Sequence, residues 1–496
     1  MTERVEAIDQ RQTYEQGKTI FDRSVSGRRG IELPALDVPQ SELPPSELLR
    51  DELSLPQIDQ LTVVRHYHNL SGENFGVDTG TYPLGSCTMK YSPKIDDEIV
   101  SSSEFTEAHP ARPELAQGNL QIFFELQGYL SQITGMDATS CTPMAGAQGE
   151  LTGILLIKKY HQTNGQSSRT KVLIPDSAHG TNPATAAMAG YEVVVVETDS
   201  DGNTDLSDLQ VKADEKTAAM MITYPSTLGL FDPNIERIID IVHKAGGQVY
   251  GDGANMNALL GRVRPGDLGF DALHLNLHKT FSIPHGGGGP GAATISVKAH
   301  LAPFLPAPIV EKEEEAYKLV TPKDSIGRVG KWYGNAANLV RAYLYIRSLG
   351  EEGLKAVADS AVLNANYLFA RLKAYYEYKY PIRSTVAHEV VLKGTRQKRH
   401  SGVRTLDIAK RLIDYGFHPP TIYFPLTVEE ALMIEPTESE TKEGLDAFIE
   451  AMIQIAKEAE ENPELLKTAP HFTPVGRLDE AEAARRPDLK WKPLEP

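Results

Sequence analysis

Cysteine is scarce in this sequence of 496 residues, which contains only Cys87 and Cys141. Two thiols do not make a disulfide framework, and these two lack the spacing of metal ligands. The chain also lacks an apolar run that approaches the roughly 18 residues of a membrane span. Its first ten residues, MTERVEAIDQ, are too acidic for a signal or transit peptide. These absences predict a cytoplasmic protein with no disulfide framework, metal centre or membrane segment.

Basic residues are also fewer than acidic ones, since the chain has 50 lysines and arginines against 67 aspartates and glutamates and a formal net charge of −17. Binding to a phosphate backbone requires a basic face, so this balance argues against nucleic acid as a partner. The length allows two to four domains at roughly 150 residues each. We therefore expect a soluble protein with more than one domain and with partners other than nucleic acid.

The stretch LHLNLHKTFSIPHGGGGP, residues 273–290, combines a reactive side chain with a glycine-rich loop. A strand-like run over 272–276 leads to His278 and Lys279, and four glycines follow at 286–289. A partly desolvated lysine has a lowered pKa, so its free amine can form a Schiff base with a carbonyl cofactor or substrate. Glycines let the backbone come close to a bulky flat ligand. The alternative for Lys279 is a surface lysine beside a turn.

A carboxylate precedes that lysine by 27 positions, in the stretch VYGDGANMNA at 249–258. A short apolar strand, residues 248–250, leads to Asp252 in a glycine-flanked turn. An aspartate near a strand end can keep a pyridinium nitrogen protonated, which makes the ring of pyridoxal phosphate an electron sink. The alternative is a helix N-cap. Together, Asp252 and Lys279 favour the cofactor interpretation.

A candidate phosphate site lies in CTPMAGAQGE, residues 141–150, which opens an apolar helix predicted over 151–160. Small residues at a helix start leave backbone N–H groups free to bind phosphate at the positive end of the helix dipole. Gly146, Ala147 and Gln148 are the candidates for this contact. A plain tight turn into the helix is the alternative.

Six strand-like segments alternate with helical or loop stretches, which indicates a largely parallel sheet covered on both faces. Ligands gather at the carboxyl ends of such strands. His179, in the stretch SAHGTNPA, follows one strand and could lie flat against a cofactor ring, or could be a loop histidine with a backbone partner. Thr227, in TYPSTLG, follows another strand and could supply a hydroxyl. The six predicted strands span residues 171–174, 192–197, 218–223, 248–250, 272–276 and 293–297.

Three regions are expected along the chain. Residues 1–75 form a proline-rich extended arm followed by a helix, and the regular leucines of this arm predict a subunit interface. Residues 76–334 form the large ligand-binding domain, whose acidic run at 311–315 is expected to be a solvated connection. Residues 335–496 form a smaller α/β domain with an extended polar tail.

Several of these stretches are long enough to resemble a known family. LHLNLHKTFSIPHGGGGPG, VYGDGANMNA, DSAHGTNPA, TYPSTLG and YPLGSCTMK are similar to the P-protein of the glycine cleavage system, glycine dehydrogenase (decarboxylating). The tail stretch GRLDEAEAARRPDLKW is similar as well, so the likeness runs from about residue 57 to the C-terminus. The family has two forms, one long chain of two homologous halves or two separate subunits. This chain has the length of one half and carries the lysine, so it resembles subunit 2, the β subunit.

The resemblance implies a fold-type I enzyme with a mostly parallel seven-stranded sheet and a smaller C-terminal α/β domain. Lys279 would hold pyridoxal 5'-phosphate as a Schiff base, Asp252 would bind the pyridinium nitrogen, and His278 would contact the cofactor. His179 and Ala254 would cover the two faces of the ring. Glycine would lose CO₂, and its aminomethyl group would pass to the lipoyl group of the H-protein. The implied assembly is an α₂β₂ heterotetramer with a homologous subunit 1 (α) that lacks the lysine.

Three other functions remain open at this point. A different fold-type I enzyme that acts on a small amino acid, of decarboxylase or desulfurase type, would share Asp252 and Lys279 without the long flanking motifs. A nucleotide-binding protein would use the glycine-rich loop, but HGGGGPG lacks the GKS or GKT ending of a P-loop. A regulatory scaffold would need neither Asp252 nor Lys279.

Overall fold

The computed structural model describes residues 18–39, 41–51, 53, 55–285, 291–331, 333–381 and 385–489. By its internal contacts the chain forms two units, Met1–Thr79 with Pro470–Pro496, and Gly80–Ala469. The glycine-rich loop at 286–289 and the acidic N-terminal stretch lie outside the described residues. All the candidate site residues named above belong to the larger unit, Gly80–Ala469.

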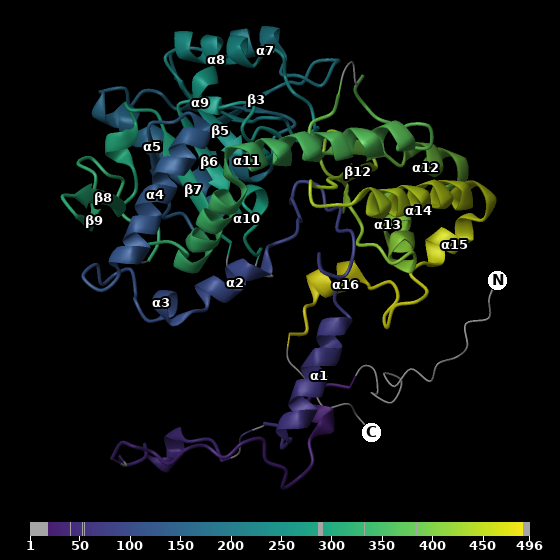
Figure 1. The fold of residues 1–496 in the computed structure, drawn as a ribbon. Coiled ribbons are helices and arrows are strands. Elements are labelled where there is room, and N and C mark those ends of the chain that lie inside the picture. Colours follow the sequence, from purple (N-terminus) through teal and green to yellow (C-terminus); the bar gives the residue numbers. More distant parts are fainter. Residues whose placement is uncertain are drawn as a thin grey trace. The chain divides into compact units, whose positions relative to one another are not determined.

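A seven-stranded sheet forms the centre of the larger unit, with the strand order β1-β7-β6-β5-β4-β2-β3 (Figure 1). The five strands from β2 to β6 are parallel to one another, and β7 runs antiparallel to both β6 and β1. The predicted fold class, a mostly parallel seven-stranded α/β sheet, is therefore confirmed. The strands are β1 (Ala138–Ser140), β2 (Lys171–Pro175), β3 (Glu192–Val196), β4 (Thr217–Thr223), β5 (Gln248–Gly253), β6 (Ala272–Asn276) and β7 (Ala293–Val297).

Helices cover both faces of this sheet, as continuous apolar strands require. One face packs on α5 (Gly146–Thr163) and α6 (Thr181–Met188), whose apolar residues share a core with β2, β4 and β7. The other face packs on α4 (Gln117–Thr134), α8 (Ile235–Lys244) and the first half of α11 (Ala336–Leu372). The remaining helices here are α2 (Lys94–Val100), α3 (Ser103–Thr106), α7 (Leu206–Lys212), η4 (Met256–Ala258), α9 (Pro265–Leu268), α10 (Leu277–Thr280) and η5 (Ala302–Phe304).

A second, three-stranded antiparallel sheet has the order β10-β12-β11. It packs with the second half of α11 around a separate apolar core. The helix α11 breaks at Gly350, where φ is 61°, and it contributes to the first core as far as Ala358 and to the second from Ala365 on. This part comprises β10 (Val390–Lys393), α12 (Thr395–Ser401), α13 (Thr405–Asp414), β11 (Thr421–Ile422), β12 (Ala431–Ile434), α14 (Lys442–Glu461) and α15 (Pro463–Thr468). The predicted domain boundary near residue 335 falls at the start of α11 and stays a prediction.

Two local predictions were wrong. The acidic run at 311–315 is not a plain connection, because it lies in a hairpin of β8 (Ile309–Glu313) and β9 (Ala316–Val320). Its glutamates are exposed, which explains why the sequence resembles a loop. Asp252 does not lie in a turn, because β5 continues to Gly253. The turn signal came from the flanking glycines, but an added Cβ at Gly253 would lie only 2.0 Å from the carbonyl oxygen of His274 on the neighbouring strand.

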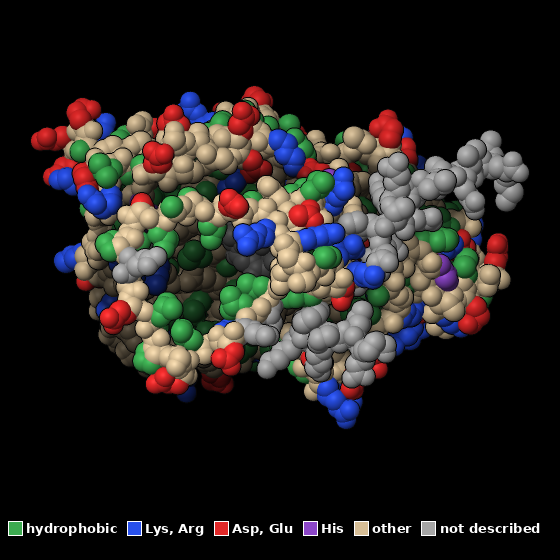
Figure 2. Space-filling view, turned by 90° about the horizontal axis from the view of Figure 1, so that it is seen from below, with side chains coloured by type: hydrophobic (Ala, Val, Ile, Leu, Met, Phe, Trp, Pro, Cys, Tyr) green, Lys and Arg blue, Asp and Glu red, His purple; other side chains and the backbone are tan. Residues whose placement is uncertain are grey.

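The smaller unit contains the arm, with η2 (Phe21–Arg23) and η3 (Ser46–Leu48), and the helices α1 (Gln60–Gly72) and α16 (Glu480–Arg485). Large apolar side chains along the arm are exposed, among them Leu36 and Leu43 at 75 % and 80 %. Acidic and basic side chains are interspersed over the face that Figure 2 shows. Within the described residues, no helix has the length and apolar character needed to cross a membrane.

Candidate active site

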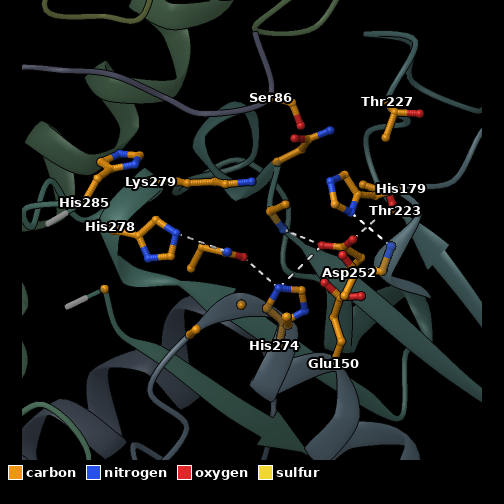
Figure 3. Close-up of a pocket in the computed structure, with 18 residues that line it drawn as sticks. Ser86, Glu150, His179, Thr223, Thr227, Asp252, His274, His278, Lys279 and His285 are labelled. Carbon is orange, nitrogen blue, oxygen red and sulfur yellow. Dashed lines mark hydrogen bonds and ion pairs between the residues drawn. The ribbon is translucent and has the colours of Figure 1, made fainter. Parts of the chain in front are cut away.

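A pocket of about 290 Å³ opens where β4, β5 and β6 end. Ligand sites of parallel sheets gather at this edge, as predicted. Figure 3 shows Lys279 extending into the pocket toward the side where His179 and Asp252 lie. The lining residues are Ser86, Ala145, Gly146, Ala147, Glu150, His179, Thr181, Thr223, Thr227, Asp252, Ala254, Asn255, His274, Asn276, His278, Lys279, His285 and Gly291. The pocket therefore brings together every candidate residue except Gln148.

Asp252 is almost fully buried in this pocket and is 2 % exposed. Its Oδ1 accepts a hydrogen bond from the backbone N–H of Ala254 at 2.9 Å, and its Oδ2 accepts one from Asn182 Nδ2 at 3.3 Å. Burial alone would raise the pKa of Asp252, but electrostatic interactions with His274 and Lys279 outweigh burial and hold this pKa below its ordinary value. The carboxylate therefore stays ionised, as a partner for a buried cation must.

A chain of hydrogen bonds runs along β6 beside Asp252. The Tyr250 hydroxyl lies 2.6 Å from His274 Nδ1, and His274 Nε2 lies 2.7 Å from Asn276 Oδ1. Asn276 Nδ2 lies 3.4 Å from His278 Nε2, and His278 Nδ1 lies 3.2 Å from the carbonyl oxygen of Ala292. Burial lowers the pKa of both histidines, that of His278 to about 3. Both imidazoles are therefore neutral, each with its proton on the nitrogen that faces an oxygen acceptor.

Lys279 lies on α10, the short helix that directly follows β6. Within the described part of the chain, its amine makes no hydrogen bond or ion pair and points into the pocket. An amine in this position is available for a covalent bond to a carbonyl group of a ligand.

The backbone just after Lys279 is held by a second, buried lysine. Lys90 Nζ donates to the carbonyl oxygen of Thr280 at 2.7 Å, to Asn257 Oδ1 at 2.9 Å and to Glu438 Oε1 at 2.7 Å. A further contact joins Lys90 to the Tyr345 hydroxyl at 3.0 Å. Burial would lower the pKa of Lys90, but the ion pair with Glu438 outweighs burial and raises it. This cluster fixes the end of α10 and thereby the position from which Lys279 extends.

The start of α5 provides free backbone donors at the pocket wall. No side chain caps this helix, so the N–H groups of its first turn lack intrahelical partners. Gly146 and Ala147 line the pocket. The side chain of Gln148 turns away, since its Oε1 accepts from the N–H of Met144 at 2.7 Å and its Nε2 donates to the carbonyl oxygen of Val329 at 2.5 Å. Any contact of Gln148 with a phosphate would therefore use its backbone N–H.

Glu150 lies one turn further along α5 and is buried in the pocket wall. Its Oε2 has no hydrogen-bond partner. Burial, together with the charge of Asp252, raises the pKa of Glu150 to about 9, although Lys279 opposes this shift. Two carboxyl groups in one buried pocket thus take different protonation states at neutral pH, with Asp252 ionised and Glu150 neutral.

Three other predicted residues lie at the pocket. His179 is exposed there, and its ring meets that of Phe424 edge to face at 5.6 Å between centroids. Ala254 is buried beside Asp252. Thr227 is buried and donates its hydroxyl hydrogen to the carbonyl oxygen of Ser177. Their roles toward a cofactor stay predictions.

The segment 80–93, which precedes α2, also reaches the pocket, through Ser86. Ser86 and Thr88 adopt left-handed backbone conformations, with φ of 63° and 52°. Such conformations are strained for residues other than glycine, and hydrogen bonds to the neighbouring small sheet hold them. Between them, Cys87 is a free thiol whose pKa burial raises to about 11, although Lys279 opposes this shift.

The residues present fit pyridoxal phosphate. An unpartnered amine among the described residues, an ionised buried carboxylate and the free N–H groups of a helix start share one pocket of the right size. With the sheet order, these features define a fold-type I pyridoxal-phosphate enzyme.

Comparisons with known proteins specify the family. The chain is 56 % identical over 481 residues to a probable glycine dehydrogenase (decarboxylating) subunit 2 of Halalkalibacterium halodurans, which covers 96 % of this chain and 98 % of the relative. It is 54 % identical over 479 residues to the protein of the same description from Listeria welshimeri, with 95 % and 98 % covered. The chain belongs to the glycine dehydrogenase (decarboxylating) subunit 2 family.

Family models and a solved structure agree with this assignment. The model described as glycine dehydrogenase, C-terminal domain, matches residues 357–471, and that described as aminotransferase class-V matches residues 152–313. A crystal structure of glycine decarboxylase (P-protein) of the glycine cleavage system, in inhibitor-bound form, superposes with a TM-score of 0.69. It is 21 % identical and covers 83 % of this chain and 93 % of its own, so it supports the fold.

Sequence reasoning missed several residues of the pocket. His274 and Asn276 carried a usable signal, because the polar residues of LHLNLH alternate with leucine and so share one face of a strand. Ser86, Asn255 and His285 carried no comparable signal, because they come from loops whose course the pattern does not define.

Proposed function

We propose that this chain is the lysine-bearing subunit of a glycine decarboxylase that works within a glycine cleavage system. Glycine loses CO₂, its α carbon bonds to one sulfur of a lipoyl disulfide on the H-protein, and the second sulfur becomes a thiol. The disulfide is thus the oxidant, and no nicotinamide is needed in this subunit. The alternative of another small amino-acid decarboxylase or a desulfurase is not favoured by the family assignment.

One observation carries the cofactor assignment, namely that the amine of Lys279 and the ionised carboxylate of Asp252 share one pocket. When bound, pyridoxal 5'-phosphate supplies an electron sink for the bond that breaks at the α carbon. Lys279 would hold it covalently, and Asp252 would pair with its ring nitrogen. His179 and Ala254 would bound the ring faces, and the backbone N–H groups of Gly146, Ala147 and Gln148 would bind its phosphate.

The other pocket residues would position these groups and control protons. Neutral His274 donates its Nε2–H to Asn276 and lies beside Asp252, whose Oδ1 is 3.6 Å from that nitrogen, so it borders the carboxylate without adding a charge. His278 and Thr227 would border the cofactor. Glu150, neutral at pH 7, is an acid that can hold a proton inside a wall that excludes water.

The proposed partners are a homologous subunit 1 without the lysine, in an α₂β₂ heterotetramer, and the lipoylated H-protein. Exposed leucines of the arm support a subunit interface, because burying them would be favourable. We place the assembly in the cytoplasm. The two free cysteines suit a reducing compartment.

The decisive experiment measures exchange of the carboxyl carbon of glycine with labelled bicarbonate. The purified chain is first loaded with pyridoxal phosphate, which absorbs at about 420 nm when bound. With lipoylated H-protein alone, it is expected to show little exchange. Adding subunit 1 should restore exchange. Non-lipoylated H-protein is the matched control and should support little exchange.

Two results would contradict the proposal in different ways. Full exchange by the chain with H-protein alone would contradict the need for subunit 1 and would leave the proposed glycine chemistry standing. If the chain with bound cofactor does not exchange the carboxyl carbon of glycine when both partners are present, the proposed glycine reaction is wrong. Turnover of a different small amino acid under the same conditions would then favour the alternative.

A further inference from the structure

Two buried glutamates face each other at the end of the small sheet. The last pair of the β10–β12 ladder is Val390 with Ile434. Glu389 precedes Val390 and Glu435 follows Ile434, so the two glutamates lie opposite each other at the next position of the ladder. Each is 0 % exposed. Like charges directly opposite each other on a sheet are destabilising, and burial increases the cost. Something must compensate for this arrangement.

Each oxygen of the two carboxylates accepts one hydrogen bond, which leaves a second lone pair on each oxygen. The N–H of Ser86 donates to Glu389 Oε2 at 2.9 Å, and Asn255 Nδ2 approaches Glu389 Oε1 at 3.5 Å. Thr88 donates to Glu435 twice, from its N–H at 2.9 Å to Oε2 and from its hydroxyl at 2.5 Å to Oε1. These donors are neutral. Throughout the described ranges, no lysine or arginine forms an ion pair with either glutamate.

His388 completes the cluster and is itself without partners. His388 is 0 % exposed, and neither nitrogen of its ring has a hydrogen bond. Its Nε2 lies 3.6 Å from Glu435 Oε1, which is too far for a hydrogen bond and close enough for two ligands of one ion. Burying an imidazole whose two nitrogens lack hydrogen bonds costs folding free energy, unless a group between the side chains binds the ring.

We propose that His388, Glu389 and Glu435 bind a divalent transition-metal ion, with one ring nitrogen and two carboxylate oxygens as ligands. One such atom from each residue lies within 4.8 Å of the others. An imidazole with two carboxylates suits Zn²⁺ or Mn²⁺ better than Mg²⁺ or Ca²⁺, which prefer oxygen ligands alone. The ion would neutralise both glutamates and bind one of the two unbonded nitrogens of His388. The sequence predicted no metal, because these ligands come together only when β10 and β12 pair.

The site would act on the neighbouring pocket through the loop. Ser86 and Asn255, which both line the pocket, are the residues that contact Glu389. A bound ion would fix Glu389 and Glu435, and with them the strained loop at Ser86 and Thr88. The role of the ion is therefore to position this loop, and its binding does not depend on the proposed function.

The test is equilibrium dialysis of the full chain, with any affinity tag removed, against Zn²⁺ and, separately, Mn²⁺ after chelator treatment. Elemental analysis should find one tightly held ion per chain, and the bound Mn²⁺ should give an altered electron paramagnetic resonance spectrum. His388→Gln and Glu435→Gln should each weaken binding at least tenfold. Glu430→Gln, at another buried glutamate, is the matched control and should bind like the wild type.

A folding readout separates ligand loss from misfolding. The wild-type midpoint of thermal unfolding should rise with metal concentration, because the ion binds only the folded state. Both ligand variants should lose this dependence while remaining folded at low temperature. The proposal is overturned if neither metal binds above one ion per ten chains, or if both variants bind as the wild type does. A metal-free chain that Glu435→Gln stabilises would instead show a proton shared between the carboxylates.

Discussion

The pocket around Lys279 and the N-terminal arm differ in which side chains they bury and which they expose. In the pocket, polar groups are buried, as Asp252 shows with its 2 % exposure and its two hydrogen-bonded oxygens. In the arm, apolar groups are exposed, as Leu36 and Leu43 show. Each arrangement runs against the usual preference of its residue type for the interior or the surface.

This contrast indicates where each region obtains its stabilisation. The pocket lies entirely within the unit Gly80–Ala469, whose own residues supply its hydrogen bonds. The arm buries little in its own unit, so its leucines contribute free energy only when another surface covers them. Cofactor binding and assembly should therefore be separable by mutation.

Lys279→Ala is the sharpest way to break the chemistry alone. Loss of the amine should reduce glycine turnover by about 10⁵ or more, since no described residue replaces a covalent bond to the cofactor. The midpoint of thermal unfolding and the association with subunit 1 should stay near wild type. Turnover is measured by carboxyl exchange, and borohydride reduction of the wild type with peptide mapping should label Lys279. A label on any other lysine would contradict the assignment.

Serine at the four arm leucines should break the assembly and leave cofactor binding intact. Leu36, Leu43, Leu48 and Leu49 are exposed, and burying four such side chains is worth about 4 to 6 kcal/mol. The fourfold variant should bind subunit 1 at least about 10³-fold more weakly, while its pocket still takes up pyridoxal phosphate. Analytical ultracentrifugation with absorption detection reports both properties.

The control for the arm is another exposed apolar residue. Val211→Ser, in the larger unit, removes a side chain that is 83 % exposed and should leave association unchanged. Equal weakening by the control would mean that the arm has no special role. Deleting residues 1–56 should act like the fourfold variant.

Lys90→Met sharpens the comparison by removing a buried charge from the pocket unit. It leaves Glu438 buried without its ion pair, which should cost about 3 to 5 kcal/mol of unfolding free energy. Urea denaturation measures this loss. Adding Glu438→Gln should recover part of the stability, because the orphaned charge disappears. A single variant that loses under about 1 kcal/mol would show that the cluster does not hold α10.

Much of the large sheet could be predicted, because its strands are continuous apolar runs bounded by turn residues. The end of α4 at Gly135 and the break of α11 at Gly350 were also predictable, since glycine takes positive φ at both. The strand β1 was missed because three residues, Ala138 to Ser140, carry no periodicity. Its pairing with β7 comes from tertiary structure alone.

The site divides in the same way. Lys279 and Asp252 could be predicted, because each lies at or beside a strand end in a distinctive stretch. Lys90 and Ser86 could not, since their contacts join residues hundreds of positions apart, as in the bond of Lys90 to Glu438. Side-chain direction was also beyond the pattern, so Gln148 was grouped with Gly146 although its amide turns to Val329.

Asp252→Asn tests the electrostatic half of the pocket with its shape kept. Losing the carboxylate charge beside a protonated ring nitrogen should cost about 2 to 4 kcal/mol in this buried site, so turnover should fall by about 10² to 10³. The exposed Asp267→Asn is the control and should behave as wild type. Wild-type turnover in Asp252→Asn would show that this carboxylate does not stabilise the cofactor's charge.

Glu150→Gln has the smallest expected effect and probes the neutral acid of the pocket. Burial, together with Asp252, raises the pKa of Glu150 from its ordinary 4.5 to about 9. Protonation therefore favours the folded state. This contribution is complete below about pH 4.5 and is lost as pH rises toward 9, with a slope of at most about 1.4 kcal/mol per pH unit. Glutamine resembles the protonated form, so the variant should lose less stability than the wild type between pH 6 and pH 8.

Urea denaturation at several pH values measures this difference. The exposed Glu443→Gln is the matched control on another helix, and its curve should run parallel to the wild type. Because the wild type carries other titrating groups, only the difference between the two curves reports on Glu150. If that difference stays constant from pH 6 to pH 8, Glu150 is already ionised in the folded chain. The pocket would then hold two negative charges, and the separation of roles between Glu150 and Asp252 would fail.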